Sequence, residues 1–229
     1  MNCRTVILIM LNLIFSGFVK AQPQIKNKFG IFTFKEISKD FFSENKFDFD
    51  NKRQNFTPLW IRSDKEEIQN IEKNSYVMRL KDSLIITTHD SIVKFIDYTI
   101  KDNGFCKNMY SGFIDKINSH LIGQTWWEYH SALLINGDSG KTTKVGNSIY
   151  VLNDINKLLT IYSDDLSCEI EIDLFDFEES SDLKLLYKVK WDNCNLKIED
   201  FIIDKKLNIR IKSNNGKYYQ IIRKIGTPH

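Results

Sequence analysis

The sequence contains 229 residues, with 32 basic and 30 acidic side chains and a formal net charge of +2. The lysines and arginines are spread along the chain rather than gathered into the basic stripe that neutralises phosphates, so we expect no nucleic-acid partner. This length accommodates one large β domain or two small ones. Because no Gly- or Ser-rich linker divides the chain, we predict a single β-rich domain over residues 22–229.

The first 21 residues have the pattern of a secretory signal peptide. A short polar start, "MNCR", precedes the apolar run "TVILIMLNLIFSGFV", and small residues follow where a signal peptidase would cut, before Gln22. The alternative is an uncleaved membrane anchor, but the run is shorter than the ~20 apolar residues that cross a bilayer. We therefore expect an exported protein, periplasmic or extracellular, that is soluble after cleavage and has no later membrane span.

The segment after the signal mixes strand and helix patterns. "FGIFTF" favours a strand, whereas "TFKEISKDFFSENK" places four apolar residues at helical spacing. Those residues are Phe34, Ile37, Phe41 and Phe42. Further on, "SDKEEIQNIEK" opens with Ser63 and has Glu66 three positions later, which is the pattern of a capping box. We predict a short helix there, with Ile68 and Ile71 on one face.

From Ser75 onward, short alternations of apolar and polar residues recur about every ten residues. In "CEIEIDLF", one face carries Cys168, Ile170, Ile172 and Leu174, and the other carries Glu169, Glu171 and Asp173. In "LNIRIKS", Leu207, Ile209 and Ile211 oppose Asn208, Arg210 and Lys212. A period of two with charges on the outer face is typical of half-buried antiparallel strands. We predict an all-β fold, an antiparallel meander with a short N-terminal helix.

Three cysteines follow the predicted signal: Cys106, Cys168 and Cys194. In an oxidising compartment one pair could close and leave one thiol. The alternation of "CEIEIDL" favours a buried, unreactive thiol at Cys168. The cysteine spacings match no zinc pattern, and a metal site at His130 would need further ligands such as His120. We predict no metal and no cofactor.

The stretch "ALLINGDSGKTTKVGN" is similar to two catalytic motifs. A phosphate-binding loop needs a glycine five residues before Gly140 and a helix after Lys141, but Ile135 stands at the first position and β-branched residues follow. A serine protease with Ser139 as nucleophile needs a distant histidine base, and the upstream histidines lie too close in sequence. We predict a β-hairpin, with Gly137 and Gly140 at positive φ.

Three stretches of the chain are similar to successive strands of a known structural unit. "LLINGDSGK" is similar to the first strand and turn of a propeller blade, "VLNDINKLLTIYSDD" to the second strand and "SCEIEIDLFDF" to the third. With "KVKWDNCNLKIEDFIIDKKLNIRIKSNNGKYYQIIRK", residues 108–224 resemble small secreted bacterial β-propeller-like proteins of unknown function. The resemblance implies antiparallel blades and no catalytic residues. Since a blade takes roughly 40–50 residues, the expected fold is partial or irregular β-propeller-like, with a β-sandwich as the alternative.

The densest unusual segment is "GQTWWEYHS", residues 123–131. Along one extended strand, Trp126, Glu128 and His130 would share a face, and Trp127 and Tyr129 the opposite face. An aromatic ring beside a carboxylate and an imidazole would suit a sugar or a peptide. The alternative is structural, with Trp126 covering the edge of the core and Glu128 pairing with His130.

Three functions remain in competition. The leading hypothesis is an exported, non-enzymatic binding module whose ligand, a protein or a glycan, is unidentified. The second is a secreted hydrolase that uses Glu128 and His130 as acid–base groups. The third is an inhibitor or immunity-type protein that blocks another exported enzyme. Turnover of peptide, ester or glycan substrates would separate the second hypothesis from the first.

Overall fold

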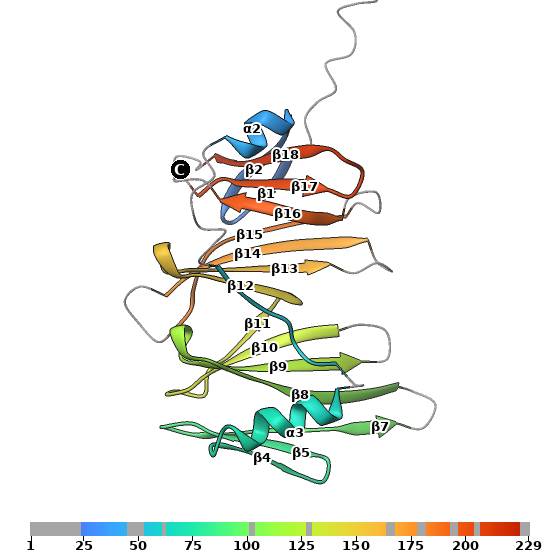
Figure 1. The fold of residues 1–229 in the computed structure, drawn as a ribbon, viewed down its shortest axis with the longest axis vertical. Helices are drawn as coiled ribbons and strands as arrows, with labels where there is room; N and C mark the ends of the chain where they lie inside the picture. The colour runs from blue at the N-terminus through green and yellow to red at the C-terminus, as the bar shows by residue number, and fades with distance from the viewer. Residues whose placement is uncertain are drawn as a thin grey trace, which may run out of the picture.

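The computed structural model consists mainly of antiparallel sheets and confirms the all-β prediction (Figure 1). It describes residues 24–44, 53–60, 63–100, 104–126, 130–163, 168–177, 182–192, 197–203 and 207–224. The predicted signal peptide lies outside these residues. Within them, no helix is both long and apolar enough to cross a membrane.

The strands form four sheets, which we number I to IV. Sheet I has the order β1 (Gln24–Asn27), β2 (Gly30–Ile37), β18 (Tyr218–Lys224), β17 (Ile209–Ser213) and β16 (Ile198–Ile203). Sheet II has the order β15 (Lys184–Asp192), β14 (Glu169–Asp176), β13 (Lys157–Ser163), β12 (Ser148–Leu152) and β3 (Arg53–Phe56). Sheet III has the order β11 (Thr142–Val145), β10 (His130–Asn136), β9 (Ser119–Trp126), β8 (Gly104–Ile114) and β7 (Tyr98–Ile100). Sheet IV has the order β4 (Val77–Leu80), β5 (Ser83–Thr87) and β6 (Ile92–Ile96).

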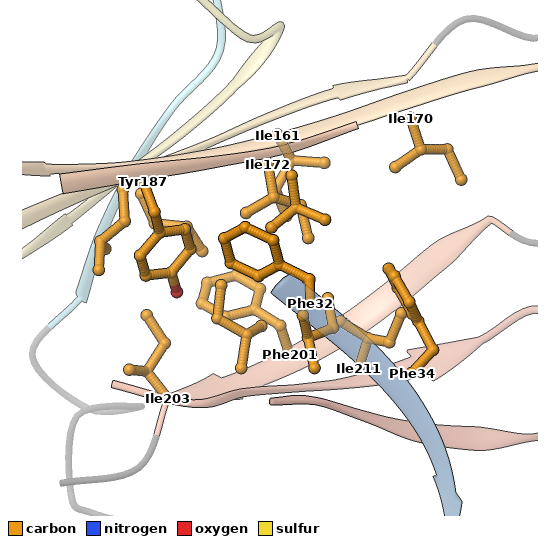
Figure 2. Close-up of a cluster of buried hydrophobic side chains, with 14 of the residues drawn as sticks. Phe32, Phe34, Ile161, Ile170, Ile172, Tyr187, Phe201, Ile203 and Ile211 are labelled. Atoms are coloured by element: carbon orange, nitrogen blue, oxygen red, sulfur yellow. The ribbon is translucent and has the colours of Figure 1, made fainter. Parts of the chain in front are cut away.

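The sheets stack face to face in the order I, II, III, IV, like a β-sandwich extended to four layers (Figure 1). A separate hydrophobic core fills each of the three spaces between layers. Figure 2 shows the core between sheets I and II, where Phe32 and Phe201 from sheet I face Ile172 and Tyr187 from sheet II. Sheets I and IV lie at opposite ends of the stack, so each has one face without a neighbouring sheet.

The N-terminal part of the chain contributes to each layer in turn. Strand β2 pairs with β18 in sheet I, and β3 pairs with β12 in sheet II. Helix α3 (Asp64–Glu72) then packs on β8 of sheet III, and β4 opens sheet IV. The remaining chain returns through sheets III and II to sheet I. Strands that are distant in sequence therefore complete the first two sheets.

Helix α2 (Lys39–Ser43) follows β2 directly. It begins at Ser38, whose hydroxyl accepts a hydrogen bond from the N–H of Phe41 at 3.1 Å. Phe34 and Ile37 lie in β2, so of the two patterns that overlap in this segment the strand holds for them and the helix begins only at Lys39. The pairing of residues 31–37 with residues 218–224 holds this segment extended.

Helix α3 confirms the predicted short helix, but the Ser63 side chain makes no capping hydrogen bond. Of the expected apolar face, Ile71 packs against the core between sheets III and IV, whereas Ile68 is exposed and its neighbour Glu67 is buried. The Glu67 carboxylate accepts hydrogen bonds from the Tyr110 N–H at 2.7 Å and from the Arg79 guanidinium at 2.6 Å. These partners belong to sheets III and IV, so a buried charge joins the helix to both layers.

Strand β14 confirms the predicted alternation on its apolar face. Ile170, Ile172 and Leu174 are buried in the core between sheets I and II. Asp173, which the pattern predicts to face water, is buried, because sheet III covers the other face of sheet II. The Lys188 ammonium lies 3.2 Å from its Oδ2, but burial dominates and raises the pKa of Asp173 to about 7.

Strand β17 departs from the predicted alternation in one place. Ile209 and Ile211 are buried as expected, and Leu207, which precedes the strand at a positive φ of 59°, packs against the same core. Arg210, expected to face water, is buried. It is covered by α2, and its guanidinium donates hydrogen bonds to the Phe41 and Glu44 carbonyls.

Two of the cysteines differ in state. Cys106 in β8 is a buried free thiol, and burial raises its pKa to about 11. Cys168 is half-buried and disulfide-bonded, so the prediction of a buried thiol there is wrong. The physical reason is local: β14 begins at Glu169, and Cys168 lies before it at a φ of 59°, outside the alternating pattern.

Sheets II and III share one kind of turn, which the sequence repeats. "IDKIN" at residues 114–118 and "LNDIN" at residues 152–156 each form a 3₁₀ turn that ends at an asparagine. Asn118 has a φ of 44° and Asn156 a φ of 49°. Asparagine reaches this left-handed region more readily than most residues. The same turn therefore reverses β8 into β9 and β12 into β13.

Candidate functional site

The residues predicted to form a binding platform do not share a strand. Strand β9 ends at Trp126 and β10 begins at His130, and the two strands form a hairpin. His130 pairs directly with Thr125, so these two side chains point to the same face of sheet III. Trp126, next to Thr125, points to the opposite face. The expected common face is therefore wrong, and Glu128 lies outside the described residues.

Trp126 and His130 pack against different aromatic partners. The half-buried Trp126 meets Tyr98 edge-on at 6.0 Å between ring centroids, and the exposed His130 lies 4.9 Å from Trp60. His130 and Trp60 line a cavity of about 420 Å³ that also reaches Lys197. A binding role for these residues stays a prediction.

A second cavity, of about 470 Å³, lies where turns of sheets III and IV meet. We name it the His120 pocket. Its walls are residues 73–76 before β4, residues 87–89 at the end of β5 and just after it, Phe113, Asn118 and His120 around the β8–β9 turn, and residues 137 and 138 after β10. Four segments that are separated in the sequence thus meet at one end of the two layers.

Backbone hydrogen bonds join three of these turns to one another. The His89 N–H donates to the Gly137 carbonyl at 3.0 Å, and the Asp90 N–H donates to the Asp138 carbonyl at 2.8 Å. The Gly137 N–H donates to the Asn118 carbonyl at 2.7 Å. The pocket wall is therefore built from mutually bonded turns rather than from independent loops.

The two glycines of "NGDSG" permit this close approach. The predicted hairpin of β10 and β11 is confirmed, and Gly140 has the expected positive φ, 71°. Gly137 does not, and its role is different: a Cβ there would lie 2.6 Å from the side-chain oxygen of Asn118. At Gly140 a Cβ would also lie 2.1 Å from the Ser91 hydroxyl. Side chains at these positions would push the turns apart.

His120 is the most deeply buried polar group of the pocket wall, with 3 % of its surface exposed. Burial lowers its pKa to about 4, so the imidazole is neutral at physiological pH. The Phe113 ring packs edge-on against it at 4.8 Å between centroids. His120 thus presents a neutral polar group among apolar neighbours.

A short hydrogen-bond chain fixes the tautomer of this imidazole. The Asn74 side-chain N–H donates to the Tyr110 hydroxyl at 2.8 Å, and that hydroxyl lies 3.2 Å from His120 Nδ1. Tyr110 is fully buried, so its own proton needs an acceptor, and Nδ1 is the one within reach. We assign Nδ1 as the acceptor, which leaves the ring proton on Nε2.

The "GDSG" serine is not arranged as a nucleophile. The Ser139 hydroxyl donates to the Asn136 side-chain oxygen at 3.0 Å, which also accepts the Asp138 and Ser139 N–H groups. His89 bonds instead to Asp90, 2.5 Å from Nδ1 to Oδ1, and this carboxylate raises the pKa of His89. The segment after Lys141 is strand β11, so the helix of a phosphate-binding loop is missing at this position.

Sequence reasoning considered Ser139 and the upstream histidines as a possible protease triad, and His120 also as a possible metal ligand, but not as parts of one pocket. It missed the pocket because the contacts that form it join turns up to about 50 residues apart. A signal was present in Gly137 and Asn118, since a turn glycine and a left-handed asparagine both mark close backbone approach.

Two further observations bear on function. Among the residues that the structure describes, no group of three His, Cys, Asp or Glu side chains could hold a metal ion. Neither a comparison with protein-family models nor a search of curated proteins finds a match for the sequence. The resemblance to secreted propeller-like proteins stays a prediction, and the geometry of the site has to carry the functional argument.

Proposed function

We propose that this protein is an exported, non-enzymatic binding module whose ligand occupies the His120 pocket. The ligand is a small polar molecule or the exposed part of a larger partner, either a glycan or a protein. Support for export comes from the signal-like residues 1–21, with cleavage before Gln22.

The observation that carries the proposal is the prior organisation of the pocket wall. The turns at His89, Asn118 and Gly137 are held by their own backbone hydrogen bonds, and His120 is held by Tyr110. A ligand that enters does not have to order these groups, so less of the interaction free energy is lost on binding. The cavity volume of about 470 Å³ lies in the range of small-molecule sites.

The chemistry of the wall supports binding rather than catalysis. A general acid or base works best when its pKa lies near the working pH, whereas burial holds the pKa of His120 at about 4. The Ser139 hydroxyl donates to Asn136 and not to an imidazole. The Asp138 side chain is exposed at the rim, where it can accept hydrogen bonds from a ligand.

The proposal is tested by a ligand screen run in parallel with a turnover assay on peptide, ester and glycan substrates. We expect ligands that raise the melting temperature of the wild type and of Asp82→Ala, but not of Asp138→Ala. Asp82 is a matched exposed carboxylate of sheet IV outside the pocket. Turnover that disappears in Glu128→Gln would establish the hydrolase instead. Export is tested separately by mass spectrometry of the secreted protein, which should begin at Gln22.

A further inference from the structure

We propose that the ligand of the His120 pocket is a neutral saccharide, an inference that rests on the proposed binding function. Four properties of the wall lead to this class: a fixed neutral donor, balanced charges, an exposed aromatic ring and the absence of a strand edge from the lining segments. Each property excludes a different alternative.

The fixed donor is His120. Tyr110 occupies Nδ1, and no hydrogen bond within the described residues engages Nε2. The ring is neutral, so it offers one N–H donor without a buried charge. A ligand hydroxyl can accept from Nε2 and can donate its own proton to a carboxylate such as that of Asp138, which lines the same pocket. Adjacent hydroxyls of a sugar ring are suited to such a donor–acceptor pair.

The charges of the wall balance. Lys73 and Asp138 carry opposite charges at the rim, and His89 is paired with Asp90. A bound anion loses its hydration and needs a surplus of positive charge nearby. The His120 pocket has no such surplus, so a neutral ligand is favoured over a phosphate or a carboxylate.

The aromatic ring is that of Tyr76, 64 % exposed, at the pocket rim. Its backbone N–H donates to the Asn74 side-chain oxygen, and its carbonyl accepts from Thr87 N–H, so the main chain beneath the ring is fixed. A flat aromatic face beside polar groups matches a sugar ring, which has an apolar C–H face and a polar rim. The polar side chains around it would lose their hydrogen bonds with water if a purely apolar ligand entered.

The wall consists of turns and strand ends, and this argues against an extended peptide. Peptides in extended form bind by adding a strand to an exposed sheet edge. The segments that line the pocket are the turns before β4, after β5, between β8 and β9, and after β10. They offer converging side chains rather than a row of backbone groups.

The test is an NMR titration of the ¹⁵N-labelled protein with three probe sets. The first contains glucose, galactose, mannose, N-acetylglucosamine and their dimers and trimers. The second contains galacturonic acid and its oligomers, which keep the ring but add charge, and the third contains neutral tripeptides. We expect a member of the first set to shift the resonances of Tyr76, Asn118 and His120. A long-range ¹H–¹⁵N spectrum should show His120 protonated at Nε2.

Substitutions at Tyr76 and Asp138 then test how much each side chain contributes to saccharide binding. Tyr76→Ala should weaken saccharide binding about tenfold or more, whereas Tyr76→Phe, which keeps the ring, should stay within about threefold of the wild type. Asp138→Asn should weaken it about tenfold, because a carboxylate accepts a stronger hydrogen bond than an amide. Equal losses in Tyr76→Phe and Tyr76→Ala would overturn the role of the ring.

The outcomes distinguish this inference from the proposed function. If uronic acids or tripeptides shift the pocket resonances and neutral sugars do not, the saccharide inference is overturned and the binding function stands. If no neutral saccharide binds, the inference is also overturned, and the broader ligand screen decides the binding function. A His120 ring protonated at Nδ1 would remove the fixed donor on which the inference depends.

Discussion

The two end sheets of the stack differ in what covers their outer faces. Helix α2, only five residues long, lies over the outer face of sheet I (Figure 1). Its Phe42 is buried and meets the Tyr218 ring at 5.0 Å between centroids. The outer face of sheet IV exposes Met78, Leu80, Ile92 and Ile96 instead. Apolar side chains therefore occur on both outer faces. Those of sheet I are shielded from water where α2 covers them, whereas those of sheet IV are exposed.

At the end covered by α2, a buried arginine also finds hydrogen-bond partners in the helix. Arg210 on the outer face of sheet I donates hydrogen bonds to the Phe41 and Glu44 carbonyls at 2.8 and 2.6 Å. Its guanidinium lies 4.5 Å from the Phe41 ring centre. Because these carbonyls belong to the C-terminal turn of α2, the arginine replaces hydrogen bonds that the helix itself cannot make. A helix of only five residues can therefore cover the outer face of the sheet, because an arginine of that sheet donates hydrogen bonds to the C-terminal carbonyls of the helix.

The largest expected difference between the ends comes from removing a buried ring. Phe42→Ala should lower the free energy of unfolding by about 4 kcal/mol, because it deletes a buried aromatic side chain. Ile92→Ala, on the bare end, should change it by less than about 1 kcal/mol, because Ile92 is 70 % exposed. Urea unfolding followed by circular dichroism measures both. Similar losses in the two variants would mean that the ends are equally covered.

A change of pH should loosen the end that contains sheet IV. His120 titrates near 4 when folded and near 6.5 when unfolded, so the unfolded chain binds more protons between these values. The stability contributed by neutral His120 is complete above pH 6.5 and is lost as the pH falls toward 4, by an amount on the order of 3 kcal/mol. Hydrogen exchange at pH 7 and pH 4.5 should show faster opening around β9 in acid. A His120→Gln variant should lose this dependence.

The α2 end, by contrast, is held by an arginine that stays charged across the same range. Arg210→Met keeps much of the side-chain length and should lower the free energy of unfolding by about 2 kcal/mol, because two carbonyls lose a charged donor. The loss should be the same at pH 7 and pH 5. Lys212→Met, on the same strand but more exposed, is the control and should be nearly neutral. A pH-dependent loss in Arg210→Met would contradict this account.

At the exposed outer face of sheet IV we expect the smallest effect on stability, but a measurable effect on self-association of the protein. Replacing Met78 and Ile92 by Ser should change the free energy of unfolding by less than about 1 kcal/mol. It should reduce any concentration-dependent self-association, since exposed apolar patches promote contacts between proteins. Analytical ultracentrifugation of the wild type and of the double variant makes the comparison. A large loss of stability would show that this face is covered in solution.

Period-two alternation allowed much of the fold to be predicted. In β14 the inward residues Ile170, Ile172 and Leu174 were identifiable, because a face packed on a core must be apolar. Asp173 and Arg210 were not identifiable as buried. Asp173 is buried because sheet III covers sheet II, and Arg210 is buried because α2 covers sheet I. The residues of β14 and β17 alone do not indicate that these elements cover them.

The candidate site was less predictable than the fold. The single strand expected over Trp126 and His130 is divided into β9 and β10, which reverses the faces of the two side chains. The His120 pocket depends on hydrogen bonds between turns, such as His89 with Gly137, and on a tautomer set by Tyr110. Such contacts are long-range and involve backbone atoms, so no local pattern of residue types encodes them.

The pairing of β2 with β18 has a consequence for the order of folding. Ile31 lies opposite Lys224, and the intervening chain must be available before these ends can meet. Contacts of such high sequence separation slow folding, because loop closure costs entropy before the contact is made. Sheet I therefore cannot be completed until synthesis of the chain is nearly finished, whereas sheets III and IV are formed by hairpins that are local in sequence.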